Sequence, residues 1–409
     1  MTYYDALETR EARERERELL ARLPGQIAHA QSKSAYYAKL LAGVDAGSVK
    51  TRAALAALPV TRKSDLLELQ KAIPPFGGLN ATPLAGLARI FMSPGPIYDP
   101  EGRKPDFWRS ARALHAAGFR SGDVVVNCYS YHLSPAASMF ETGLHRLGCA
   151  VIPAGVGQTE QQARLVADLR PRGYVVTPSF LKIILEKCDE LGLASDSIER
   201  ALVSGEAFLP PVRQFMAARG LQAFQAYGTA DLGLLAYETE AREGLVLDEE
   251  ILLEIVRPGT GDPVAEGEVG EVVATTFNED YPLLRFATGD LSAVLAGRSP
   301  CGRTNVRIKG WMGRADQTTK VRGLFVHPQQ VAEVLRRHAL ARGRLVVENE
   351  DGEDRMTLRV EHSDAADEAL ARALEASIRE ITKLRGEVRF AGAGELPNDG
   401  KVIEDARRY

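Results

Sequence analysis

The chain has 409 residues, which is enough for two or three domains with a sizeable core that needs no disulfide or metal. Hydrophobic residues make up 45% of it and charged residues 26%, as in ordinary globular proteins, which excludes a disordered, fibrous or disulfide-stapled chain. The formal charge of −4 gives no global electrostatic reason to expect nucleic acid or an anionic membrane as a partner. We therefore expect small-molecule chemistry, with no nucleic-acid and no membrane partner.

The N-terminal part of the chain predicts connecting and solvated elements. Residues 7–23 alternate Glu and Arg around a few leucines, which predicts a solvated amphipathic helix. Residues 60–66 predict a loop that ends at a capped helix start. The charge-rich start and the lack of a run of 18 apolar residues lead us to expect a cytoplasmic protein.

Four widely spaced cysteines lack metal-ligand spacing and are predicted to be reduced core thiols: Cys128, Cys149, Cys188 and Cys301.

Short apolar strands alternate with helices between residues 123 and 225. The pattern predicts parallel strands joined by right-handed crossovers, with loops at the carboxyl ends of the strands available to a ligand. The expected strands are 124–126, 150–153, 174–176, 201–203 and 222–225, and the expected helices are 135–147, 161–169, 179–191 and 210–218.

The rest of the chain has a different pattern of predicted strands and helices. Strands rich in Val, Ile and Leu, separated by turns, predict a mixed or antiparallel subdomain that includes 251–256 and 269–276. Strands 345–348, 356–360 and 388–390 with a long helix at 364–384 predict a compact α+β unit. The expected fold is therefore α/β: a large N-terminal domain, 1–315, with a parallel α/β sheet plus a mixed β subdomain, and a small hinged C-terminal α+β domain, 316–409.

Five polar segments carry the candidate chemistry. The turn Tyr-Gly-Thr-Ala-Asp at 227–231 offers a hydroxyl and a carboxylate to phosphate and metal. Thr-Gly-Asp at 288–290 places a carboxylate that can accept from two ribose hydroxyls, although a Gly-Asp turn alone is more often structural. The other three are the Gly-Glu turn in 203–208, the basic stretch 309–331, and 395–401, where a lysine follows a glycine turn.

In this order the segments resemble the adenylate-forming enzymes, and specifically the phenylacetate-CoA ligase branch. The resemblance covers nearly the whole chain and includes 36–40, 58–66 and 129–153. It implies an acid-thiol ligase that joins a carboxylic acid, expected to be aromatic, to AMP with loss of pyrophosphate. Coenzyme A thiolate then displaces AMP to give a thioester. The implied cofactors are ATP, Mg²⁺ and coenzyme A, and the implied assembly is a homodimer.

The resemblance also implies roles for individual residues. The catalytic residues are Lys401, Asp231 and Thr229, and Asp231 also holds the metal. The nucleotide-binding residues are Gly205, Glu206, Ala207, Tyr227, Gly228, Asp290, Arg314, Ser93 and Gly95. Asp316 is the hinge that swings the small domain between a pose with Lys401 on the reacting phosphate and a thioester-forming pose. Gly323 lines the coenzyme A route in that second pose, and Tyr129, Tyr131 and Ser134 form the substrate pocket.

The phosphate-cradling loop departs from the family pattern. The family has a Ser/Thr/Gly-rich run that ends in Gly-Lys-Pro, whereas residues 91–105 here hold prolines that lack donors, together with Asp99 and Glu101. Arg103 and Lys104 are candidate replacement cations, and the alternative is that residues 102–105 form only a surface turn. Ala230 and Ala287 thin the nucleotide contacts, and a zinc site found in some relatives is not expected, because Ala241, Val246 and Ser299 stand where its ligands would be.

Two alternative functions stay open at this stage. A non-catalytic or regulatory descendant would bind AMP, an acyl-adenylate or coenzyme A without turning over ATP, as the altered loop suggests. An adenylating enzyme of a different kind would pass the acyl group to an amine or to a carrier-protein thiol.

Overall fold

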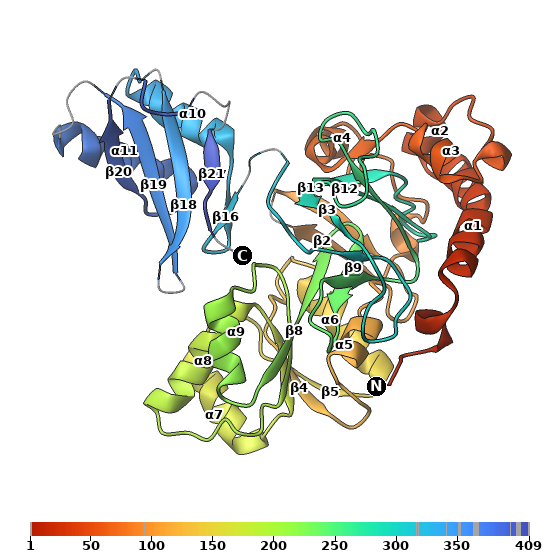
Figure 1. Ribbon diagram of the computed structural model, residues 1–409, viewed down its shortest axis with the longest axis horizontal. Helices are drawn as coiled ribbons and strands as arrows, with labels where there is room; N and C mark the ends of the chain where they lie inside the picture. The colour runs from red at the N-terminus through yellow and green to blue at the C-terminus, as the bar shows by residue number, and fades with distance from the viewer. Residues whose placement is uncertain are drawn as a thin grey trace. The chain divides into compact units, whose positions relative to one another are not determined.

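The computed structural model describes residues 2–93, 95–315, 317, 319–340, 342–350, 353–362, 368–392, 394–397 and 402–407. The chain divides into two compact units, Met1–Phe208 with Val212–Trp311, and Leu209–Pro211 with Met312–Tyr409 (Figure 1). This division falls close to the expected one. The domain boundaries 1–315 and 316–409, and the roles assigned to the two domains, stay predictions.

The first unit holds the helices α1 to α8, the strands β1 to β15, and helix α9 from Val212 onward. The helices are α1 Ala12–Lys33, α2 Ala35–Leu40, α3 Arg52–Ala56, α4 Leu66–Ala72, α5 Ala111–Ala116, α6 Ala136–Leu147, α7 Thr159–Leu169, α8 Pro178–Glu190 and α9 Pro210–Ala217. The strands are β1 Thr61–Arg62, β2 Arg89–Ser93, β3 Ile97–Glu101, β4 Val124–Asn127, β5 Ala150–Pro153, β6 Gly173–Val176, β7 Arg200–Val203, β8 Gln222–Thr229, β9 Gly233–Glu238, β10 Leu245–Leu247, β11 Ile251–Val256, β12 Gly270–Thr276, β13 Phe286–Ser292, β14 Val294–Leu295 and β15 Arg307–Ile308.

A nine-stranded sheet in the order β14-β15-β10-β9-β8-β7-β6-β4-β5 is the centre of this unit. The strands from β5 to β8 are parallel, and β8, β9, β10, β15 and β14 pair antiparallel. Val126 and Val176 face α7, α8 and α9, whereas Val125 and Val175 face α5 and α6. Successive side chains thus cover opposite faces, and Figure 1 shows α7, α8 and α9 together beside the parallel strands. The predicted α/β alternation is confirmed.

The second sheet of the first unit has the order β1-β13-β12-β11, with β1 parallel to β13 and the other pairs antiparallel. Leu23, Ile27 and Tyr37 of the N-terminal helices are fully buried in the same core cluster as Leu252 and Phe286 of this sheet. The predicted mixed β subdomain is therefore present.

Two expectations for the N-terminal part were right for the helices but missed long-range contacts. The segment 7–23 forms a short 3-10 turn and then α1, in which Leu19 and Leu23 are buried as in an amphipathic helix, but Arg15 is buried as well, and its guanidinium donates to a carboxylate oxygen of Glu249 at 2.7 Å. Residues 60–66 are more than a loop, because Thr61 is in register with Phe286 in the parallel β1–β13 pair. The sequence pattern could not show these partners, which lie more than 200 residues away.

The second unit has its own sheet, in the order β20-β19-β18-β21, and a hairpin of β16 and β17. Its elements are β16 Thr319–Val321, β17 Leu324–Val326, α10 Pro328–Arg337, β18 Gly343–Glu350, β19 Glu353–Glu361, α11 Glu368–Thr382, β20 Glu387–Ala391 and β21 Ile403–Asp405. Val334 of α10 and Ile378 of α11 share one core with Val347 and Leu358 of the sheet. Both helices therefore pack on the same face, which confirms the predicted α+β architecture.

Candidate active site

Lys63 and Asp231 meet at the end of the parallel β1–β13 pair. Lys63 directly follows β1, in the short turn Lys63–Asp65, and Asp231 lies between β8 and β9. The Lys63 Nζ donates to Asp231 Oδ2 at 2.5 Å, and the Asp231 side chain is fully buried. Burial lowers the pKa of Lys63, but Asp231 and then Asp99 outweigh it and raise that pKa. The two side chains thus form an ion pair whose carboxylate lies in the interior of the protein.

Asp290 is held by two donors that fix its carboxylate. Tyr227 Oη donates to Asp290 Oδ2 at 2.9 Å, and Trp311 Nε1 donates to Asp290 Oδ1 at 3.1 Å. The Thr288 hydroxyl accepts from the Asp290 backbone N–H at 3.0 Å. The structure therefore brings the predicted residues Tyr227 and Asp290 into direct contact. Their role in binding a nucleotide stays a prediction.

The turn between β8 and β9 is shaped by a glycine and a threonine. A Cβ on Gly228 would lie 2.6 Å from the Gly233 carbonyl oxygen, so that only glycine fits there. Thr229 Oγ1 accepts from the Leu232 N–H at 3.1 Å and closes the turn. Asp231 Oδ1 is buried without a hydrogen-bond partner in the described part of the chain. This oxygen is therefore available to a cation.

Residues 89–101 form a hairpin in place of a glycine-rich phosphate loop. Strands β2 and β3 pair antiparallel with Ser93 opposite Ile97, and the Ser93 hydroxyl donates to the Ile97 carbonyl at 3.2 Å. Gly95 has a φ of +153°, and Pro94 lies outside the described residues. The side-chain amide of Gln70 in α4 donates to the Tyr98 carbonyl and accepts from the Tyr98 N–H. The hairpin is therefore fixed to the helix that directly follows the Lys63 turn.

Asp99 is a fully buried carboxylate on this hairpin. Neither of its oxygens has a hydrogen-bond partner among the residues that the structure describes. Burial raises the pKa of Asp99 well above its ordinary value and Asp231 raises it further, whereas Lys63 and Ser93 act in the opposite direction. The altered loop therefore contributes a carboxylate to the Lys63–Asp231 pair.

The Gly-Glu turn lies at the carboxyl end of β7. Gly205 has a φ of +83°, which glycine adopts without strain, and a Glu206 carboxylate oxygen accepts from the Ser179 N–H at 2.6 Å. Ala207 is partly buried beside it. The Ser204 hydroxyl donates to the Ala226 carbonyl in β8 at 2.8 Å. The turn is thus joined to the strand that leads to Tyr227.

Tyr129 has a structural role that its predicted place in a substrate pocket does not include. Its hydroxyl contacts the carbonyls of Val176 and Ser204, both at 2.9 Å, and its ring stacks on Phe140 with centroids 5.1 Å apart. A Cβ on Gly205 would lie 3.8 Å from this ring. The residue thus joins the ends of β6 and β7 beside the Gly-Glu turn, and only its ring is left to contact a substrate.

The other predicted pocket residues lie in the loop before α6. Tyr131 is exposed, and its hydroxyl donates to Glu141 in α6. The Ser134 hydroxyl accepts from the Ala136 N–H at 3.5 Å. Their contact with a substrate stays a prediction.

Of the predicted residues in the C-terminal part, Arg314 and Gly323 are described and belong to the second unit. Asp316 and Lys401 lie outside the described residues. Their roles as hinge and catalytic lysine stay predictions.

Arg103 and Lys104 line a pocket of about 510 Å³ in the first unit, together with Arg89, Glu101 and Arg146. The Arg103 Nε donates to the Gly86 carbonyl at 3.2 Å. No hydrogen bond or ion pair joins either residue to Asp231 within the described ranges. Their predicted contact with the outer phosphates of ATP stays a prediction.

The sequence predictions missed two residues of the site. Lys63 belongs to the Thr-Arg-Lys-Ser-Asp-Leu segment, which predicted only connecting structure, and Trp311 belongs to the basic stretch 309–331. A lysine within a family-like motif was the available signal for the first. The Asp290 contact of Trp311 depends on folding and has no local signal.

The four cysteines are all buried and unpaired, as expected for core thiols. Cys301 accepts from the Arg303 guanidinium at 3.5 Å and contacts the Ser299 hydroxyl at 3.0 Å. Among the described residues, no group of three or more His, Cys, Asp and Glu is arranged to hold a metal ion, and no helix is long and apolar enough to cross a membrane.

Comparison with known proteins gives the class of the protein first. Residues 107–277 match the family model of the AMP-binding enzymes. The chain is 33% identical, over an alignment of 384 residues, to the phenylacetate-coenzyme A ligase of Thermus thermophilus, and the match covers 89% of this chain and 85% of the relative. It is 31% identical, over an alignment of 387 residues, to the enzyme of the same name from Aromatoleum evansii, and this match covers 88% of this chain and 86% of that relative. The chain therefore belongs to the phenylacetate-coenzyme A ligase family.

A solved structure gives the same result for the fold. The structure of 2-hydroxyisobutyryl-CoA ligase in complex with 2-HIB-AMP and CoA matches with a TM-score of 0.80 and 25% identity, covering 98% of this chain and 92% of that chain. The expected adenylate-forming fold is confirmed.

Proposed function

We propose that this protein is an AMP-forming acid-CoA ligase that makes an acyl-adenylate from ATP and an aromatic carboxylic acid and then an acyl-CoA thioester. Family membership supports the reaction class. The observation that carries the proposal is the site itself: the Lys63–Asp231 ion pair and the Tyr227–Asp290 contact lie in one unit of the chain.

In the first half-reaction the chain binds and orients ATP. Asp290 accepts from the ribose hydroxyls in this proposal, because an ionised carboxylate offers two oxygens that can each accept more than one hydrogen bond, and Tyr227 and Trp311 fix its orientation. Lys63 supplies a positive charge beside Asp231, where the anionic phosphate oxygens gain charge as pyrophosphate leaves. Lys401 is the proposed second cation at the α-phosphate.

The residues present fit a magnesium ion. Asp231 Oδ1 is a buried carboxylate oxygen with no protein partner in the described part of the chain, and Mg²⁺ is commonly held by one or two carboxylates together with substrate phosphates. When bound, the ion neutralises charge on the phosphate oxygens. Asp231 is the residue that would hold it, with Lys63 adjusting the charge on the same carboxylate.

In the second half-reaction the thiolate of coenzyme A displaces AMP from the acyl-adenylate. Gly323 is the proposed lining of the pantetheine route. It has a φ of +84°, and a Cβ built there meets nothing within 4 Å, so the turn leaves space along which a ligand can pass. Asp316 is the proposed hinge between the two half-reactions.

The proposed substrate is an aryl acid of the phenylacetate type, which the names of the relatives support. The ring of Tyr129, which stacks on the buried Phe140 and lies near Gly205, is the aromatic group proposed to contact such a ring. We also propose that the enzyme works in the cytoplasm as a homodimer. The family resemblance supports this assembly, and light scattering of the purified chain tests it.

Acid-dependent exchange between pyrophosphate and ATP tests the proposed function. We expect exchange with phenylacetate or a related aryl acid, and thioester formation when coenzyme A is added. A panel that includes 2-hydroxyisobutyrate and other aliphatic acids serves as the comparison. The absence of exchange with every acid would contradict the proposal.

A binding-only function is the second candidate, and the buried Asp99 favours it, because a carboxyl group in the phosphate loop supplies no N–H donor to a triphosphate and, where it is ionised, repels a triphosphate more than a monophosphate. Thermal shift separates the two, since a ligand that binds only the folded state raises stability by RT ln(1 + [L]/Kd). Stabilisation by AMP but not by ATP with Mg²⁺ would favour the binding-only function.

A further inference from the structure

A pocket rich in arginine lies within the second unit. It has a volume of about 580 Å³, within the usual range of roughly 300–1,000 Å³ for small-molecule sites. Five of its ten lining residues are arginines, against two glutamates, and this excess of positive charge selects an anionic ligand. The arginines are Arg322, Arg355, Arg372, Arg379 and Arg385.

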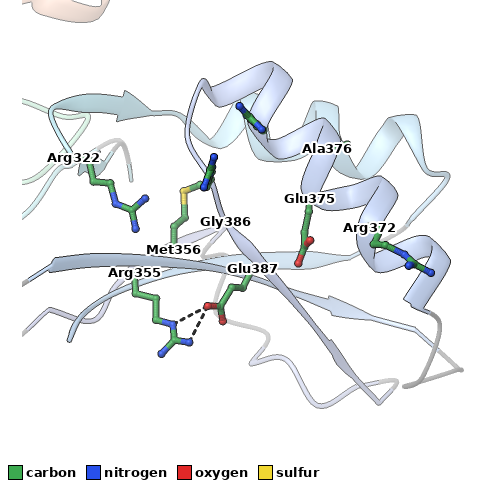
Figure 2. Close-up of a pocket in the computed structure, with 10 residues that line it drawn as sticks. Arg322, Arg355, Met356, Arg372, Glu375, Ala376, Gly386 and Glu387 are labelled. Carbon is green, nitrogen blue, oxygen red and sulfur yellow. Dashed lines mark hydrogen bonds and ion pairs between the residues drawn. The ribbon is translucent and has the colours of Figure 1, made fainter. Parts of the chain in front are cut away.

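The pocket is built from one helix face and two strands. Arg372, Glu375 and Arg379 are three and four residues apart along α11, so they lie on one face of that helix. Arg355 of β19 donates to a carboxylate oxygen of Glu387 in β20 at 2.8 Å, and Figure 2 shows this pair along the strands with α11 beside it. The arrangement therefore rests on regular elements and not on loops alone.

The five arginines are not equally available to a ligand. Arg355 is held by its strand neighbour, and Arg322 donates to the Asp354 carbonyl at 2.8 Å. Arg379 and Arg385 are exposed, and neither has a side-chain hydrogen bond or ion pair within the described ranges. A guanidinium without a protein partner keeps all of its N–H donors, and its planar fork matches phosphate geometry.

The pocket begins beside the turn proposed for the pantetheine route. Arg322 and Gly323 form the turn of the β16–β17 hairpin, and Arg322 lines the pocket. Coenzyme A has a neutral pantetheine arm and, at its other end, a diphosphate and a 3′-phosphate that are anionic at neutral pH. We propose that this arginine pocket binds the 3′-phosphate and diphosphate end of coenzyme A. The inference rests on coenzyme A being the acyl acceptor.

The double variant Arg379→Ala, Arg385→Ala tests the pocket with three acceptors: coenzyme A, dephospho-CoA and pantetheine. We expect KM for coenzyme A to rise about tenfold or more with kcat little changed, because uniform binding energy is lost. KM for pantetheine stays as in the wild type. The preference for coenzyme A over dephospho-CoA shrinks, since the cations that contact the 3′-phosphate are gone.

The matched control is Arg336→Ala, Arg389→Ala, which removes two exposed arginines of the same unit that do not line the pocket. This control keeps the wild-type KM for coenzyme A. An unchanged KM in the Arg379, Arg385 variant, or an equal rise with pantetheine, would overturn the proposal. Transfer to a carrier-protein thiol but not to coenzyme A would also overturn it and would favour an acidic protein as the occupant.

Calorimetry of coenzyme A binding separates this proposal from the proposed function. It needs no turnover, so it decides the pocket even in a protein that shows no pyrophosphate exchange. Wild-type binding that weakens about tenfold in the Arg379, Arg385 variant, but not in the control, supports the site. Equal affinities of the wild type and this variant overturn it.

Discussion

At the scale of single residues, Asp99 is a carboxylate whose ionisation is opposed by burial and by a second carboxylate. Its pKa is raised well above the ordinary value near 3.8, with Asp231, Lys63 and Tyr281 as the titratable groups coupled to it. A raised pKa means that the folded state binds the proton more tightly than the unfolded state. The resulting stabilisation is complete below the ordinary pKa and is lost as the pH rises through the pKa of the folded state.

We expect Asp99→Asn to become progressively more stable than the wild type as the pH rises. The asparagine removes the penalty of ionising a buried carboxyl, at up to about 1.4 kcal/mol per pH unit between the two pKa values. Urea unfolding from pH 5 to pH 9 measures the difference in free energy of unfolding. The exposed Asp262→Asn is the control and shows no such trend. A gain in Asp99→Asn that is the same at every pH would contradict the assignment.

Lys63 and Asp231 form an ion pair in which each group compensates the charge of the other. Because the Asp231 side chain is fully buried, removal of its partner leaves a buried charge without compensation. We expect Lys63→Met to lower the free energy of unfolding by about 3 kcal/mol, and the double variant Lys63→Met, Asp231→Asn to regain much of this loss. Denaturant unfolding of the two single variants and the double variant measures the coupling. Additive effects would show that the pair contributes no interaction energy.

At the scale of elements, the prediction succeeded where hydrophobic periodicity carries the information. Strand β4 and helix α6 follow the expected ranges 124–126 and 135–147 closely, because a run of consecutive Val residues and a regular apolar stripe are local features. The predictions failed where burial depends on a distant charge. The local sequence around Arg15 predicts a solvated side chain, yet Arg15 forms an ion pair with Glu249 in the folded chain.

The β2–β3 hairpin shows the same limit for the candidate site. Its sequence showed two added acids and three prolines, but only the fold shows that the two acids differ. The charge of Asp231 raises the pKa of Asp99. Glu101 instead accepts hydrogen bonds from the Arg89 guanidinium and the Ser138 hydroxyl. Alternation along a strand cannot distinguish these two residues, because both lie on one face. The contacts of Lys63 and Trp311 were likewise invisible, since they join segments that are distant in sequence.

The segment after this hairpin holds the two cations predicted to contact the outer phosphates of ATP. If Arg103 and Lys104 contact the outer phosphates of ATP, the change Arg103→Ala, Lys104→Ala raises KM for ATP and leaves AMP affinity unaltered. Steady-state exchange kinetics and AMP calorimetry measure the two quantities. Arg164→Ala, Arg170→Ala removes two exposed arginines outside the pocket and is the charge-matched control. An unchanged KM for ATP would assign Arg103 and Lys104 to the surface pocket alone.

At the scale of the whole molecule, the two units divide the proposed chemistry. Asp231, Asp290 and Lys63 belong to the first unit, whereas Gly323 and the arginine pocket belong to the second. In the proposed mechanism the two half-reactions need different poses of the small unit. A residue of that unit therefore acts in only one of the two steps. The division of residues between the units therefore makes the half-reactions separable by mutation.

Lys401 tests this separation directly. Its proposed position at the α-phosphate predicts that Lys401→Ala lowers acid-dependent pyrophosphate exchange by about 100-fold or more, the scale for loss of one preorganised electrostatic partner. Thioester formation from a synthetic acyl-adenylate should survive, because the lysine has left the site in the second pose. Lys383→Ala, an exposed lysine of the same unit, is the control and should leave both steps unchanged. Equal loss of both half-reactions in Lys401→Ala would mean that the residue supports the unit as a whole, and loss of neither would remove it from the catalytic machinery.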